Sequence, residues 1–404
     1  MAKAYDISII GSGIAGSMAA LRLAERHPNA RAILIDVGRP PMKRRRQLEG
    51  FLGCFPTGDG KIYPGDLERV KDIVDGRKAT PVWKWLMGYF KEVNPMKLTR
   101  TPKPSAAAKK RIKTAGFELE CDNYYQWKPE SVHKLSKMIS EIMEEAGNIT
   151  YSFDNEVFSI RKQRGGTFAV ETAAGTIVSR KVILCVGRSG WRWVTNLYDD
   201  LGIISNDDWA RYGVRLEMPA VYMKDFNKSH LTIRNEGLEV GPMCWHGTII
   251  PEDHSDLVIS AFRSNEDRWR SEKVTFSLLK PIYFDDQGSV QTDRVGKLSF
   301  LLFNDRVSRE KIKTFMSSRS QLNLIPEYDW LSQTLTELDE IYPQLCNKGY
   351  FHVPNIDPMA AKIRLGTNLE SEIDGMFVAG ESAGIRGIAA AAIMGATCAD
   401  SACK

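Results

Sequence analysis

A glycine-rich segment near the N-terminus has the residue types and spacing of a phosphate-binding turn. The segment Gly11-Ser12-Gly13-Ile14-Ala15-Gly16 follows an apolar run, Tyr5–Ile10, and precedes a helical pattern over Ser17–Arg26. A second apolar run, Ala32–Ile35, ends in Asp36. Glycines let the backbone approach a pyrophosphate, the helix N-terminus offers free N–H groups, and a carboxylate after the second strand can accept hydrogen bonds from a ribose. The predicted chemistry is dinucleotide binding, by the glycine segment together with Asp36, Val37, Gly38 and Arg39.

A second glycine-rich junction near the C-terminus resembles the first in form. An apolar run, Asp374–Glu381, ends in Gly-Glu, and the turn 382–387 leads into a small-residue helix over Ile388–Ala399. Another apolar run, Val182–Gly187, has the composition of a buried parallel strand. A helix N-terminus stabilises negative charge, so these segments predict further contacts with a bound cofactor. The candidates are Gly187, Arg188, Gly380, Glu381, Gly387 and Ile388; the alternative is a helix packed closely at a sheet edge.

The glycine motif is shared by sites for flavin and nicotinamide dinucleotides and does not distinguish them. The segment Leu48–Lys61, which includes Gly53, is dense in glycine and lies soon after the second strand. Such a loop suits close backbone approach to a large planar cofactor, although an ordinary surface loop has the same composition. The chain contains one G-x-G-x-x-G segment, so a second dinucleotide domain is not expected.

Candidate groups for proton transfer lie in the segment Gly241–Gly247, which contains Cys244 and His246. His246 is the first candidate for a general base or a substrate anchor, and Cys244 the second. The alternative is a histidine that only satisfies loop hydrogen bonds. Arg386 is a third candidate, because it lies within the C-terminal glycine-rich turn. No segment has the spacing of metal ligands, and no metal site is predicted.

The remaining elements predict an α/β fold with a discontinuous dinucleotide-binding domain over residues 1–65, 130–205 and 355–404. Ser131–Ala146 has helical periodicity, and Glu156–Arg161, Thr167–Thr172 and Thr176–Lys181 predict a small β-meander. A second, α+β domain is expected over 206–354. Its strand-like runs are Gly213–Glu217, Leu257–Phe262 and Lys297–Phe303, with a helix over Asp329–Tyr342.

The positive charge of the chain is concentrated in one stretch. The 404 residues carry a net charge of +5, of which Trp83–Lys113 contributes +8, so the remainder sums to −3. Trp83, Trp85, Tyr89 and Phe90 lie among these cations, a mixture that suits nucleic acid. The alternative is a solvated connection with buried aromatic residues. We expected residues 66–129 to form this basic insertion as a separate unit.

Cysteine usage and hydropathy indicate the compartment. The seven cysteines include no Cys-x-x-Cys pair, which favours a reducing, cytoplasmic environment. The longest apolar run, 388–399, is too short to cross a bilayer, so no membrane association is expected.

Taken in order along the chain, these motifs resemble flavoproteins of the glutathione-reductase type, and most nearly the poorly characterised FAD-dependent dehydrogenases of bacteria and archaea. The resemblance rests on Gly11–Gly16, Gly50–Gly53 with Asp59-Gly60-Lys61, Val182–Gly190, Gly213–Ala220 and Val378–Gly384. It implies FAD as cofactor and a Rossmann-type FAD-binding domain. Two departures, Cys54-Phe55-Pro56 and Ile385-Arg386, lie where the resemblance implies the flavin. Arg386 would stabilise an anionic reduced flavin, hold an anionic substrate, or lie at the surface.

The resemblance implies an FAD-dependent oxidoreductase that works by hydride transfer, and we expect the substrate to be a small amine or a similar C–H or C–N compound. A flavoenzyme that modifies a nucleobase or a nucleic-acid-linked amino group, held by Trp83–Lys113, is the alternative. A flavin-binding scaffold without catalysis is a further alternative. The electron acceptor stays open between O₂, nicotinamide and another acceptor.

Overall fold

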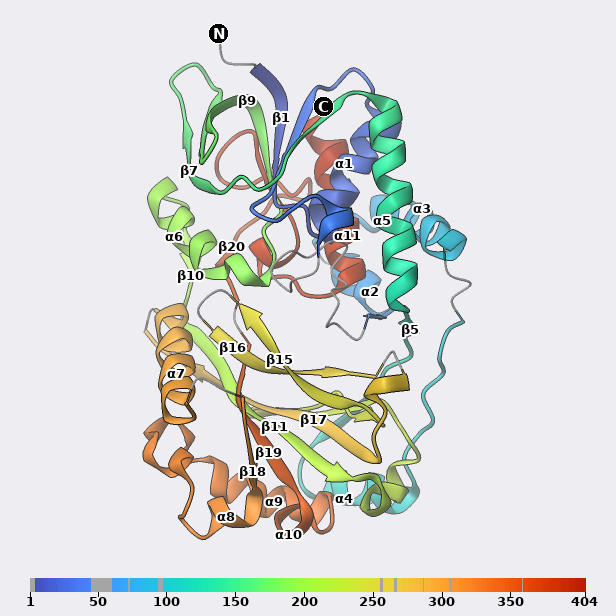
Figure 1. The fold of residues 1–404 in the computed structure, drawn as a ribbon, viewed down its shortest axis with the longest axis vertical. Helices are drawn as coiled ribbons and strands as arrows, with labels where there is room; N and C mark the ends of the chain where they lie inside the picture. Colours follow the sequence, from blue (N-terminus) through green and yellow to red (C-terminus); the bar gives the residue numbers. More distant parts are fainter. Residues whose placement is uncertain are drawn as a thin grey trace.

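The computed structural model describes residues 4–44, 60–71, 73–93, 97–254, 257–264, 267–285, 287–304, 307–357 and 359–404. Two parts lie one above the other (Figure 1). The upper part holds both chain ends and a mainly parallel sheet, and the lower part holds an antiparallel sheet. Each part has its own hydrophobic core.

The first sheet has seven strands in the order β6-β2-β1-β9-β8-β7, with β21 beside β9. Five strands pair in parallel: β6 (Ile149–Ser152), β2 (Ala32–Ile35), β1 (Ala4–Ile10), β9 (Gly175–Leu184) and β21 (Met376–Val378). Two further strands, β8 (Phe168–Thr172) and β7 (Val157–Lys162), continue from β9 as an antiparallel meander. The sheet confirms the predicted fold class.

The helices of the upper part gather around α1 (Ile14–Arg26) and α11 (Ile388–Ala402), which pack against each other. A Cβ atom on Gly395 would lie 2.0 Å from the Ala15 carbonyl oxygen, so the two helices meet through their backbones. Around them lie α2 (Asp66–Lys71), α3 (Gly76–Val93) and α5 (Pro129–Ala146), whereas α6 (Trp191–Leu201) lies beside β7. Among the helices described, none has both the length and the apolar character needed to span a membrane.

The second sheet has eight strands in the order β18-β19-β11-β17-β13-β12-β4, and β14 also pairs with β17. The strands are β4 (Glu118–Cys121), β11 (Trp209–Pro219), β12 (Leu231–Asn235), β13 (Leu238–Val240), β14 (Cys244–Trp245), β17 (Lys273–Tyr283), β18 (Ser308–Lys311) and β19 (Tyr350–Ile356). Three two-stranded sheets complete the strands: β15 (Thr248–His254) with β16 (Leu257–Arg263), β3 (Lys61–Ile62) with β5 (Tyr125–Gln126), and β10 (Ser205–Asn206) with β20 (Lys362–Ile363).

Helices cover the outer side of the second sheet, and one of them corrects a prediction. They are α4 (Ala106–Thr114), α7 (Gly288–Leu302), α8 (Ile312–Met316), α9 (Leu331–Ile341) and α10 (Leu345–Lys348). We expected a strand over Lys297–Phe303, and this was wrong because α7 runs to Leu302. Its buried face consists mainly of small residues, while Leu298 and Leu301 are exposed. A Cβ on Gly296 would come within 2.2 Å of a Leu257 methyl carbon, so the helix packs too closely for large side chains.

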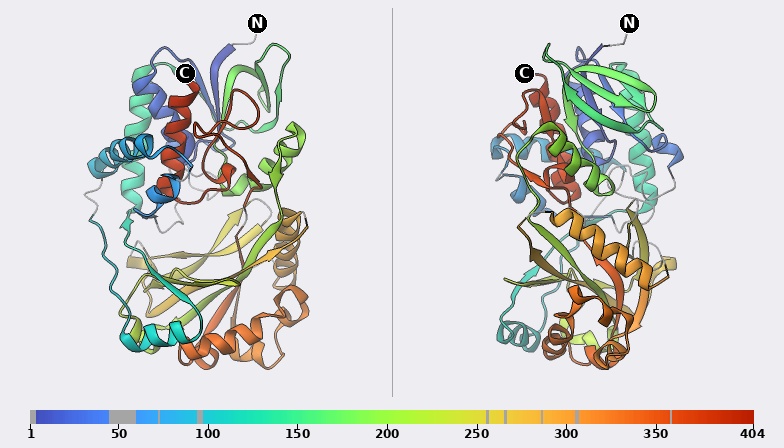
Figure 2. Two further views of the ribbon diagram at one scale, coloured as in Figure 1. Left: turned by 180° about the vertical axis from the view of Figure 1, so that it is seen from behind. Right: turned by 90° about the vertical axis from the view of Figure 1, so that its left-hand side faces the viewer.

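The basic stretch does not form a separate unit among the described residues. Phe90 of α3 is fully buried in the first core, whereas Ile112 of α4 lies in the second core. Figure 2 shows α3 beside α11 and α4 at the opposite end of the molecule. The indole of Trp85 donates to Glu25 at 2.8 Å, and the Tyr89 hydroxyl also donates to Glu25. The cations therefore lie on two distant helices and on the connection between them, and nucleic acid as a partner stays a prediction of the sequence.

Candidate functional site

A cavity of about 1020 Å³ lies between the two parts of the molecule. Its upper wall comes from the turn after β1, the end of β2, the segment after β9 and the turn before α11. Its lower wall comes from the upward faces of β11, β13, β16, β17 and β19. Because both glycine-rich junctions open into this one space, a long ligand bound at the first junction would reach the second sheet.

The turn after β1 has the geometry expected for a dinucleotide. Gly11 has φ +92°, a conformation that suits glycine, and nothing lies within 4 Å of the position of a Cβ on Gly13. The Asp36 carboxylate accepts the Ser12 N–H at 2.6 Å and the Gly38 N–H at 2.7 Å. Arg44 pairs with the same carboxylate at 3.1 Å. Each carboxylate oxygen can accept two hydrogen bonds, so Oδ2 keeps capacity for a ribose hydroxyl.

Most of the residues predicted to bind the cofactor line this cavity. They are Gly11, Gly13, Ile14, Ala15, Asp36, Val37, Gly187, Arg188, Gly380, Glu381, Gly387 and Ile388. The lining does not include Ser12, Gly16, Gly38 or Arg39. Ser12 and Gly38 act one step back, by fixing the Asp36 carboxylate through their backbone N–H groups. Gly53 lies outside the described residues.

A buried carboxyl, that of Asp66 in α2, lies against the start of α11, and the sequence did not single it out. Asp66 is 1% exposed, and a Cβ on Gly387 would lie 2.4 Å from its Oδ2. Gly387 has φ +111°, so the chain needs glycine here both for its conformation and for space. Burial raises the pKa of Asp66 to about 6, against the opposing effects of Arg69 and the Ala389 N–H.

We predict that Asp66→Asn will make the fold less sensitive to pH. The folded-state pKa lies above the value near 3.8 of the unfolded chain, so the contribution of Asp66 to stability is complete below pH 3.8 and lost as the pH rises to about 6. This shift of roughly two pKa units corresponds to about 3 kcal/mol. Urea unfolding at pH 4.5 and 7.5 should show a larger gain in stability of the variant over wild type at the higher pH. An equal difference at both pH values would contradict the assignment.

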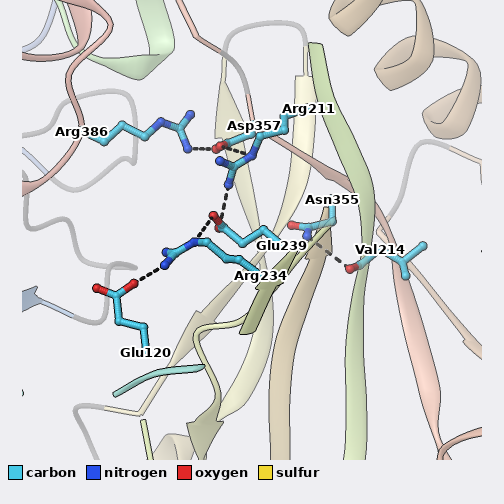
Figure 3. Close-up of polar contacts among 8 residues, drawn as sticks. All are labelled: Glu120, Arg211, Val214, Arg234, Glu239, Asn355, Asp357 and Arg386. Atoms are coloured by element: carbon cyan, nitrogen blue, oxygen red, sulfur yellow. Dashed lines mark hydrogen bonds and ion pairs between the residues drawn. The ribbon is translucent and has the colours of Figure 1, made fainter. Parts of the chain in front are cut away.

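A row of alternating charges crosses the lower wall toward Arg386 (Figure 3). Arg211 donates to Glu239 at 2.8 Å and lies 3.2 Å from Asp357, which also pairs with Arg386. In the other direction Glu239 accepts a hydrogen bond from Arg234 at 3.0 Å, and Arg234 pairs with Glu120 at the surface. We name this row, Glu120-Arg234-Glu239-Arg211-Asp357-Arg386, the charge ladder. Every ladder residue from Glu239 to Arg386 lines the cavity.

The inner end of the charge ladder meets the turn before α11. Arg386 lies 3.7 Å from Glu381, and Arg188 lies 3.7 Å from Glu381 and 4.0 Å from Glu252. Burial raises the pKa of Glu381. Burial, then repulsion from Arg188 and Arg211, lowers the pKa of Arg386. Arg386 lines the cavity and pairs with Asp357, and its role in the reaction stays a prediction.

The two candidates for proton transfer, His246 and Cys244, lie differently with respect to the cavity. His246 does not line the cavity; its Nδ1 donates to the Ser271 carbonyl at 3.1 Å, in the turn after β14. Its backbone bonds to Lys273 and Ser271 hold it in that turn. Cys244, two residues earlier, does line the cavity, and its sulfur lies 3.6 Å from Lys61 Nζ. Residues two apart in a strand lie on the same face, but β14 ends at Trp245, so His246 does not share the face of Cys244.

Several groups of the site were not predicted. They are Lys61, Tyr63, Arg211, Arg215, Glu239, Glu252 and Asp357, which line the cavity, and His230, which lies behind it. Arg211 and Arg215 lie four residues apart on β11, so period-2 alternation puts both on the cavity face. That spacing is visible in the sequence, but the partners come from distant strands and carry no local signal.

Comparisons with known proteins find solved structures that are similar to this chain at low sequence identity. No protein-family model matches the chain, and no curated protein matches it in sequence. A glycine oxidase from Geobacillus kaustophilus is 13% identical with a TM-score of 0.44, and the alignment covers 99% of this chain and 94% of that one. NikD, described as an unusual amino acid oxidase of nikkomycin biosynthesis, is also 13% identical with a TM-score of 0.41, covering 99% and 94%. PqsL from P. aeruginosa is 11% identical with a TM-score of 0.41, covering 98% and 84%.

Proposed function

We propose that the protein is an FAD-dependent oxidoreductase that oxidises the C–N bond of an amine by hydride transfer. One observation carries this proposal: a single cavity joins a dinucleotide-type turn, a second glycine-rich helix start and a polar sheet face. A dinucleotide alone would need only the upper wall. The polar lower wall supplies a place for a second reactant beside the cofactor.

The residues at the upper wall fit FAD. The open space at Gly13 and the N–H groups of α1 would hold the pyrophosphate, and Asp36 would hold the adenosine ribose. Gly187, Gly380 and the start of α11 would surround the flavin half. When bound, FAD supplies the two-electron acceptor for a substrate hydride. The protein itself has to position the substrate, exclude water and manage one proton.

The lower wall has the charges to bind an ammonium group. Glu239, Glu252 and Asp357 line it, and each lies beside a cavity-lining arginine: Arg211, Arg188 and Arg386 respectively. A carboxylate paired in this way can still accept a hydrogen bond from a substrate ammonium. Burial raises the pKa of Glu239, but Arg211 and Arg234 outweigh burial and the net shift is downward. Glu239 is therefore ionised at neutral pH. Arg211 and Arg234 also fix the direction of its carboxylate, which orients the bound amine.

The test is a flavin spectrum followed by a substrate screen. We expect purified protein to be yellow or to bind added FAD stoichiometrically, and we expect an amine to bleach the flavin when oxygen is removed. The screen should contain primary and secondary amines and amino acids, with hydroxy acids and modified nucleic acid as comparison classes. Bleaching by a hydroxy acid and by no amine would contradict the choice of substrate.

Two other results would overturn larger parts of the proposal. A colourless protein that rejects FAD in a binding titration would exclude the cofactor. A bound flavin that dithionite cannot reduce, or that never reoxidises, would favour the scaffold alternative over an enzyme.

A further inference from the structure

One wall of the cavity carries a cluster of proton-carrying groups from three distant segments. Lys61 and Tyr63 come from β3 and the residue after it, Cys244 comes from β14, and His230 lies behind them just before β12. The first three line the cavity, and His230 is 4% exposed. The Tyr63 hydroxyl lies 2.9 Å from His230 Nε2, and the two rings stack with 10° between their planes.

The hydrogen bonds of His230 determine which of its nitrogens carries the proton. Nδ1 lies 2.9 Å from the Met243 carbonyl oxygen, which can only accept a hydrogen bond. Nδ1 must therefore be the protonated nitrogen. In the neutral ring Nε2 then carries the lone pair, and it accepts the Tyr63 O–H. Tyr63 connects the cavity to a buried base.

We propose that Tyr63 and His230 form the proton acceptor for the substrate ammonium, a role that rests on the proposed amine oxidation. The ammonium N–H gives its proton to the Tyr63 oxygen as the Tyr63 proton moves to His230 Nε2. The substrate becomes a neutral amine and His230 becomes an imidazolium with the Met243 carbonyl still on Nδ1. The neutral amine would then lose a hydride from its carbon to the FAD that the proposed function requires, and its nitrogen lone pair would form the C=N bond of an iminium ion.

The surroundings of His230 contain aromatic, charged and titratable groups. The Lys61 ammonium lies 5.2 Å from the centre of the Tyr124 ring, and that ring lies 4.9 Å from the His230 ring. Cys244 Sγ lies 4.0 Å from Nδ1, and the Asp122 N–H donates to the His230 carbonyl at 3.1 Å. Burial and then repulsion from Glu120 raise the pKa of the Asp122 carboxyl, with Arg234 and Arg69 opposing.

The test compares Tyr63→Phe and His230→Gln with His246→Gln in the FAD-loaded enzyme. The probe is the amine that bleaches the flavin in the screen above, mixed rapidly without oxygen. We expect both dyad variants to slow flavin reduction by roughly 10²- to 10⁴-fold at pH 7, because a general base of this kind contributes that factor. The deficit should shrink as the pH rises toward the pKa of the amine, since the substrate then arrives deprotonated. His246→Gln should retain wild-type reduction.

A structural role for the dyad would give a deficit that does not change with pH, and this result would overturn the proposal. If His230→Gln fails to fold, Tyr63→Phe still decides, because it removes one oxygen and keeps the stacked ring.

A second readout does not depend on turnover. In holoenzyme labelled with ¹⁵N-histidine, His230 should show the Nδ1–H tautomer, and Tyr63→Phe should shift the Nε2 resonance because its hydrogen bond is lost. An Nε2–H tautomer would overturn the proposal. If no amine bleaches the wild-type flavin, amine oxidation fails as the function, while this measurement still tests the dyad geometry.

Discussion

Gly16→Ala will destabilise the folded protein with or without FAD, whereas Gly13→Ala will weaken FAD binding and leave the apoprotein intact. A Cβ on Gly16 would lie 1.8 Å from the Gly11 carbonyl oxygen, so α1 and the preceding turn would have to move apart. A Cβ on Gly13 would meet no protein atom within 4 Å, yet Gly13 lines the cavity. Its extra methyl group would enter only the space that we assign to the pyrophosphate.

For Gly16→Ala we expect a loss of about 3 kcal/mol, the upper end of what overpacking costs. Urea unfolding of the apoprotein measures it. For Gly13→Ala we expect the dissociation constant of FAD to rise roughly 10- to 100-fold, from a clash worth about 1–3 kcal/mol. A flavin fluorescence titration measures that. Equal effects of the two variants on apoprotein stability would contradict the assignment of the phosphate site.

Asp357→Asn should produce the largest loss of stability of any single change in the charge ladder. Asp357 is 7% exposed and is the carboxylate partner of both Arg211 and Arg386. The variant leaves two largely buried guanidinium groups without that charge. Breaking a buried pair by removing one partner costs about 3–5 kcal/mol. The expected result is a fall of that size in the free energy of unfolding of the holoenzyme.

Glu120→Gln is the matched control at the outer end of the same ladder. Glu120 and Arg234 are both more than a third exposed, so solvent screens their pair, and its loss should cost at most about 1 kcal/mol. Adding Arg386→Met to Asp357→Asn should restore part of the stability, because it removes one of the two guanidinium groups that have lost the Asp357 carboxylate. Similar losses from Asp357→Asn and Glu120→Gln would show that the inner pair is not desolvated.

The parts that could be predicted from the sequence are those whose signal is local. The run from Tyr5 to Asp36 contains a strand, a glycine turn, a helix and a second strand in order, and each is present. The helix over 388–399 and the meander before Val182 likewise depend on short stretches of periodicity and glycine. In such stretches the pattern that forms the element also indicates its place in the fold.

The lower wall of the cavity and the Tyr63–His230 pair could not be predicted, because their residues come together only when segments far apart in the sequence pack against each other. Tyr63 and His230 are 167 positions apart, and each is unremarkable among its neighbours. His246 was chosen for its glycine-flanked context, but a turn directs it toward the Ser271 carbonyl. The helix α7 was mistaken for a strand because its large apolar residues lie outside and its small ones inside. Local hydrophobicity does not indicate which side of a helix will pack closely against a neighbouring element.

The backbone contact between α1 and α11 affects the order in which the two parts of the protein can fold during synthesis. Strand β21 and helix α11 come last in the chain, yet α11 packs on α1 and β21 pairs with β9 in the upper part. Domains generally form as units while the ribosome is still working, and a unit cannot close before its last piece exists. The lower sheet, whose strands end at Ile356, can thus assemble on the ribosome first. Strand β1 and helix α1 therefore reach their full packing only after α11 has been synthesised.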